Sequence, residues 1–137
     1  MAYGIAYLTC LLVFGALDAL WISTMASRLY RPILGDIFLP DLRIVPALLF
    51  YLLFPIGLIL FAVMPSLRNN SMSAAFLNGF LFGAFAYGTY DLTNYATLRN
   101  WTISITLIDI VYGAVVAGAV SVAGYGSERY FLGAATS

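Results

Sequence analysis

The chain has 137 residues, of which 63% are hydrophobic and only 9% are charged. Soluble domains average about 45–50% apolar and about 25% charged residues, so this composition excludes an ordinary soluble protein and predicts an integral membrane protein. Six basic and six acidic residues give a net charge of zero, which offers no sign of a nucleic-acid partner or of electrostatic docking to anionic lipid.

Histidine and lysine are missing, because all six basic residues are arginine. The absence of His excludes ordinary haem ligation and a Ser-His-Asp triad. The absence of Lys excludes a Schiff base. We expect no cofactor and no metal centre. The one cysteine, Cys10, lies in an apolar run and is expected to be a small buried hydrophobe.

Four apolar stretches are long enough to cross a hydrocarbon core, which takes about 20 residues each. They are residues 3–25, 43–64, 73–98 and 101–124. The expected fold is therefore all-α, a single transmembrane domain over residues 1–137 that forms a four-helix bundle with short connectors.

The segments between and after these spans are too polar to cross a membrane. The first connector contains Pro32, Gly35 and Pro40, and we expect an interfacial helix within it. Pro55 lies in the middle of the second span, where it should kink the helix by freeing the Tyr51 carbonyl. The tail YGSERYFLGAATS is expected to be a short interfacial end.

The distribution of arginine gives an orientation. With four spans, the first and third connectors face one side, and the termini with the second connector face the other. The first side carries Arg28, Arg31, Arg43 and Arg99, and the second carries Arg68 and Arg129. The positive-inside rule makes the first side cytoplasmic and places both termini outside.

Three acidic residues, Asp18, Asp91 and Asp109, lie inside the spans, where each costs about 2.5–3.5 kcal/mol at a helix centre. Asp18 precedes the end of its span by seven residues, Asp91 precedes Arg99 by eight, and Asp109 follows Trp101 by eight. At 1.5 Å per residue, each lies roughly 10–12 Å inside the same end of the bundle. Three acids from three helices are therefore expected to share one layer of the membrane.

Residues three or four apart on a helix share a face, which identifies the neighbours of these acids. The layer is expected to form a polar pocket that opens toward the first and third connectors, with Arg99 and Arg43 at its mouth. Its wall would be formed by Asp18, Trp21, Asp91, Asn94, Asp109 and Tyr112. The alternative is a purely structural layer, in which neutral acids donate to tyrosine or backbone acceptors.

Three short motifs carry a resemblance to a known family: YDLTNYATLRNW at 90–101, LDALW at 17–21 and DIVYG at 109–113. They resemble a bacterial family of small predicted membrane proteins, the domain-of-unknown-function family 2177. In the third motif Tyr112 stands where the family more often has Trp. The resemblance implies a bundle of about four helices in a bacterial inner membrane, and it implies no particular activity.

Three functions fit these observations. The first is binding of a small molecule or a cation in the acidic pocket, related to transport, because oxygen-rich acidic sites suit protons and hard cations. The second is a membrane enzyme acting on a lipid, with Asp91 and Asp109 as general acid and base and Arg99 holding a headgroup. The third is an accessory subunit of a larger membrane complex. The expected partners are the lipid bilayer and one of these ligands, with a homo-oligomer or a larger complex as the assembly.

Overall fold

The computed structural model describes residues 3–25, 28, 31–34 and 44–136, and all regular secondary structure among them is helical. In chain order the elements are α1 (Gly4–Met25), α2 (Arg31–Leu34), α3 (Ile44–Leu58), the π-helical segment η3 (Ile59–Val63), α4 (Met64–Asn69), α5 (Met72–Thr97) and α6 (Ile103–Thr136). Since α3, η3 and α4 follow one another without a break, the described part of the chain has four long helical units. This confirms the predicted all-α, four-helix fold.

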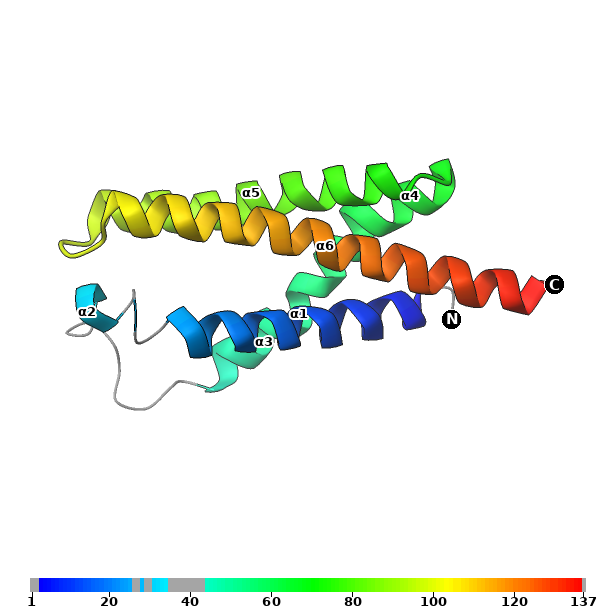
Figure 1. Ribbon diagram of the computed structural model, residues 1–137, viewed down its shortest axis with the longest axis horizontal. Coiled ribbons are helices and arrows are strands. Elements are labelled where there is room, and N and C mark those ends of the chain that lie inside the picture. Colours follow the sequence, from blue (N-terminus) through cyan, green and yellow to red (C-terminus); the bar gives the residue numbers. More distant parts are fainter. Residues whose placement is uncertain (1–2, 26–27, 29–30, 35–43, 137) are drawn as a thin grey trace.

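The helices run along one common direction, except for the unit formed by α3, η3 and α4, which crosses obliquely from the side of α1 to the side of α5 (Figure 1). Both termini and the turn between α4 and α5 lie at one end (Figure 1). The turn between α5 and α6 lies at the opposite end, together with the last turn of α1. The connectors are thus divided between the two ends as the spacing of the spans predicts.

Three of the helical units in the described residues are long and apolar enough to cross a membrane: Gly4–Met25, Ile44–Asn69 and Ile103–Phe131. Helix α5 has 26 residues and is also long enough. Its hydropathy is lower because it carries several glycines and polar residues, Asn78, Asp91 and Asn94 among them. The helix that departs from the apolar pattern is therefore the one that carries most of the motif at residues 90–101.

The last helix is longer than the span predicted from hydropathy. Helix α6 continues as one 34-residue helix to Thr136, well past the predicted end at residue 124. Nothing in this stretch stops a helix, because no proline follows and Gly124 faces Cys10 and Val63 instead of ending a turn. The tail is thus a continuation of α6 that packs near the start of α1.

The helix irregularity expected at Pro55 lies one turn further along the chain. Pro55 is inside α3, and the π-helical turn η3 begins at Ile59. Single π-helical turns inside longer helices widen the backbone and redirect the axis. Of the first connector, the four residues of α2 are described; the predicted Pro40 and Arg43 lie outside the described residues.

The core is built on a row of residues four apart along α1: Ala6, Cys10, Phe14 and Asp18 are all buried. Residues with this spacing lie above one another on a single helix face. Phe14 packs against Phe54 of α3, with ring centroids 4.9 Å apart, and the Cys10 thiol faces the Val120 carbonyl at 3.7 Å. Asp18 is the fourth member of this row, so the face that buries the core also buries the carboxylate.

Candidate functional site

Asp18 is 7% exposed and is held by tyrosines from two other helices. The Tyr112 hydroxyl of α6 donates to Oδ1 at 2.9 Å, and the Tyr51 hydroxyl of α3 donates to Oδ2. Each carboxylate oxygen therefore accepts one charge-assisted hydrogen bond, the arrangement that stabilises an ionised carboxylate away from water. The pair of hydroxyls ties α1, α3 and α6 together at this point.

Tyr51 was missed by the sequence analysis, which considered only its backbone carbonyl. A signal for it was present, because Tyr51 is the one side chain between residues 44 and 58 that can form a hydrogen bond. A lone hydroxyl in an apolar helix needs a buried partner. That partner is Asp18 on the neighbouring helix.

Tyr112 also joins the carboxylate to a layer of aromatic rings. Trp21 stacks on Tyr112 with ring centroids 4.0 Å apart and an interplanar angle of 17°. Tyr87 of α5 meets Tyr112 edge-on, with centroids 6.2 Å apart. Of the predicted site residues, the structure thus brings Asp18, Trp21 and Tyr112 into one connected group.

Helices α5 and α6 pack along a seam of small residues in a constant register. A methyl group added at Gly79 would lie 2.6 Å from the Ala117 carbonyl oxygen, and one added at Gly83 would lie 2.6 Å from the Ala117 Cβ. Such approach is possible only without side chains at those positions. Each step of four residues forward on α5 corresponds to a step of four backward on α6, and the next step places Tyr87 over Gly113.

The following step in this register brings Asp91 and Asp109 together. Asp91 is 0% exposed, and its carboxyl interacts directly with the carboxyl of Asp109. Among the described residues, no hydroxyl or N–H group donates to either oxygen of Asp91. The site therefore contains two acids side by side, one of them fully buried, whereas both oxygens of Asp18 accept hydrogen bonds from tyrosine hydroxyls.

Tyr87 lies between these two groups of acids. Its side chain packs on Gly113 and interacts electrostatically with Asp18, Asp109 and Asp91. The three acids predicted to share a layer therefore surround one tyrosine. Across the described residues, no group of three or more His, Cys, Asp or Glu side chains could hold a metal ion.

Two further predicted residues lie at the edge of this cluster. Asn94 is half-buried, and the register of the seam places it opposite Thr106, whose buried hydroxyl donates to the Thr102 carbonyl at 2.9 Å. Arg99 is exposed, just after the end of α5. Arg43, the other residue expected at the mouth of the pocket, lies outside the described residues.

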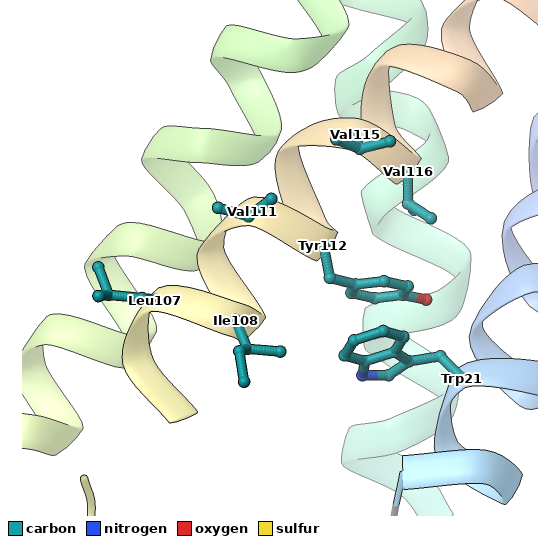
Figure 2. Close-up of a pocket in the computed structure, with 7 residues that line it drawn as sticks. All are labelled: Trp21, Leu107, Ile108, Val111, Tyr112, Val115 and Val116. Carbon is teal, nitrogen blue, oxygen red and sulfur yellow. The ribbon is translucent and has the colours of Figure 1, made fainter. Parts of the chain in front are cut away.

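A surface groove of about 540 Å³ lies beside the cluster (Figure 2). Its lining is formed by Trp21, Leu107, Ile108, Val111, Tyr112, Val115 and Val116. This wall is apolar, and Trp21 and Tyr112 are the predicted site residues that it includes. Figure 2 shows that the rings of Trp21 and Tyr112 close one side of the groove and that the Tyr112 hydroxyl points away from Leu107 and Val111.

A further buried acid lies near the opposite end of the bundle. Glu128 of α6 is 2% exposed and interacts with the backbone of Ala6 in the first turn of α1. Carboxylates are stabilised at helix N-termini by the free N–H groups there. The sequence analysis missed Glu128 because it placed this residue in a tail outside the bundle.

Comparison with known proteins identifies a family and assigns no activity. No curated protein and no solved structure matches the chain. The family described as "Predicted membrane protein (DUF2177)" matches residues 3–126, which covers α1 through most of α6. The chain is therefore a member of the DUF2177 family of predicted membrane proteins.

Proposed function

We propose that this protein binds and releases a proton at the Asp91–Asp109 pair, as part of proton movement within the membrane. This proposal rests on one observation. Asp91 is completely buried beside a second carboxyl, and no donor among the described residues forms a hydrogen bond with its oxygens. An acid in this position is either a costly defect or a site at which a small cation is taken up.

A shared proton is the cation that fits the pair best. Two adjacent carboxylates, one of them fully buried, repel each other strongly, whereas one proton held between them removes a charge and supplies a hydrogen bond. A hard metal ion needs about six oxygen ligands, and the described residues offer no cluster of three acidic or soft ligands for one. Asp18 differs from this pair, because each of its oxygens accepts a hydrogen bond from a tyrosine hydroxyl.

The orientation of the protein is part of this proposal. Arg99 follows α5 at the end where the acid layer lies, and Arg129 donates to Asn70 at the end that carries both termini. With the arginine-rich connectors in the cytoplasm of a bacterial cell, the layer lies nearer the cytoplasmic face of the inner membrane. Labelling of single cysteines introduced at Asn70 and Asn100 with a membrane-impermeant maleimide tests this, since only Asn70→Cys should react in intact cells.

Proton flux into proteoliposomes tests the proposed activity. Purified protein is reconstituted at a fixed lipid ratio, a potassium gradient with valinomycin sets the potential, and an internal pH dye reports proton entry. We expect flux above that of empty vesicles, loss of this flux in Asp91→Asn, and partial retention in Asp91→Glu, which keeps the acid. Equal flux in wild-type and Asp91→Asn vesicles would refute the proposal.

A second function, action on a lipid, is favoured by one specific observation. Tyr112 lines the apolar groove with its ring and donates a hydrogen bond to Asp18 with its hydroxyl. A lipid acyl chain bound in the groove would therefore contact a residue of the acid layer. The groove has the apolar wall that an acyl chain requires. Lipid extracts from a deletion strain, complemented with wild type or Asp109→Ala, test this, and identical lipid profiles would exclude it.

A further inference from the structure

The α5–α6 seam contains one large side chain among small ones. At successive steps of four along α5, Gly79, Gly83 and Tyr87 face α6. Gly113 accommodates Tyr87, because a Cβ at Gly113 would overlap three atoms of the Tyr87 ring. Placing a bulky aromatic ring in a close-packed seam is possible only because the facing residue is glycine.

The surroundings of Tyr87 connect the two groups of acids. On one side its ring meets the edges of Tyr112 and of Phe54, with centroids 6.2 Å and 6.1 Å away, and Tyr112 hydrogen-bonds Asp18. On the other side, one turn along each helix, Asp91 and Asp109 form the carboxyl pair. Tyr87 interacts electrostatically with all three carboxyls.

We infer that Tyr87 is the relay residue between the Asp91–Asp109 pair and Asp18. This inference rests on the proposed function. The proton held by the pair forms a new bond to the Tyr87 hydroxyl oxygen while the original hydroxyl proton of Tyr87 passes to the Asp18 carboxylate, directly or through one water molecule. Rotation of the hydroxyl then resets Tyr87, and the starting state returns when Asp18 releases its proton and the pair takes up another. One O–H bond forms for each one that breaks, so the step needs no other reactant.

The relay gives a function to the small size of Gly113. A larger residue there would push the Tyr87 ring out of the seam without altering any carboxyl. Two variants therefore probe the same step in different ways. Tyr87→Phe removes the hydroxyl and keeps the ring, and Gly113→Ala keeps the hydroxyl and displaces the ring. Tyr95→Phe, which removes an exposed hydroxyl two turns away on α5, is the matched control.

The test measures proton flux in proteoliposomes for wild type, Tyr87→Phe, Gly113→Ala, Tyr95→Phe and Asp91→Asn. Positioned proton-transfer groups contribute about 10²–10⁴-fold to rates, so we expect a loss of at least about tenfold in Tyr87→Phe and in Gly113→Ala. Tyr95→Phe should match wild type. Size-exclusion profiles and melting temperatures in detergent establish that each variant is folded.

A second readout separates a relay from a structural role. Infrared spectra after transfer into D₂O follow deuterium exchange at the carboxyls of the folded Tyr87→Phe protein. The protonated-carboxyl band of the Asp91–Asp109 pair should remain in this variant. Its deuterium exchange should be slower than in the wild type. The relay would be overturned if Tyr87→Phe had the same proton flux and the same exchange rate as the wild type while Asp91→Asn lost its flux. The proposed function would then still stand. Unchanged flux in Asp91→Asn would overturn both.

Discussion

The Tyr112 hydroxyl of α6 donates a 2.9 Å hydrogen bond to Oδ1 of Asp18 on α1, and so joins two residues 94 positions apart in the chain. Tyr51 donates to the other oxygen of the same carboxylate. Three of the four long helical units therefore meet at one acid. This contact fixes the position of α1 relative to α6 and sets the geometry of the acid layer.

Removal of one of these hydroxyls should destabilise the bundle. Tyr112→Phe leaves an Asp18 oxygen buried without its donor, which costs about 1–3 kcal/mol, while the stacking on Trp21 is retained. Unfolding by denaturant in detergent micelles measures the loss. Tyr130→Phe, at an exposed position near the end of α6, is the control and should not change the free energy of unfolding. Equal stability of the two variants would contradict the role assigned to Tyr112.

Replacement of Asp91 and of Asp18 by asparagine should have different effects on the stability of the protein. Asp91→Asn removes a potential charge that no described donor stabilises, so we expect unchanged or higher stability. Asp18→Asn replaces one of two acceptor oxygens with an amide group that cannot accept from a tyrosine, and stability should fall by about 1–3 kcal/mol. Melting temperatures of both proteins, at the same pH and in the same detergent, give the comparison. A lower melting temperature for Asp91→Asn than for Asp18→Asn would show that the acids have been assigned the wrong way round.

The close packing of α5 on α6 can be tested with glycines of the same helix. Gly83→Ala places a methyl group against Ala117 and the Gly113 backbone, and overpacking of this kind typically costs about 1–3 kcal/mol. Gly88→Ala meets nothing within 4 Å and should be neutral, or stabilising by up to about 1 kcal/mol through its higher helix propensity. Denaturant unfolding of the two variants distinguishes seam packing from propensity. If both substitutions shift the midpoint equally, the seam does not have the register described.

The extension of α6 should contribute to the stability of α1. Glu128→Ala removes the carboxylate that faces the backbone of Ala6 at the start of α1, and loss of such a capping interaction costs about 0.5–2 kcal/mol. Hydrogen exchange followed by mass spectrometry should show faster exchange in the first turns of α1 and no change in the middle of α5. Uniform exchange in the two proteins would mean that Glu128 has no capping role.

The number of helices and the depth of the acids could be predicted from sequence because both follow from apolar run lengths and the rise of a helix. The inward direction of Asp18 is similarly implied by the row Ala6, Cys10 and Phe14 on the same face. What could not be predicted is which partner each acid finds, since that depends on the rotation of neighbouring helices. Tyr51 reaches Asp18 only because α3 crosses the bundle obliquely.

The exposure of the site could not be predicted for a related reason. Helical spacing shows which residues share a face, but not whether that face is covered. The seam of Gly79, Gly83 and Gly113 brings α5 and α6 so close that Asp91 is fully buried, and the groove beside it is lined by apolar residues of α6 and by Trp21. Likewise, the full length of α6 could not be predicted from hydropathy, because hydropathy falls after Gly124 although the helix does not stop.

Infrared spectroscopy of the carboxyl groups is the most direct test of the central claim, that the Asp91–Asp109 pair holds an exchangeable proton within the membrane. Spectra of the reconstituted protein are recorded at neutral pH in H₂O and in D₂O, for wild type and for Asp91→Asn. The account predicts a protonated-carboxyl C=O stretching band in the wild type that shifts in D₂O and disappears in Asp91→Asn. A wild-type spectrum with only ionised carboxylate bands, or a protonated band that persists unchanged in Asp91→Asn, would contradict it.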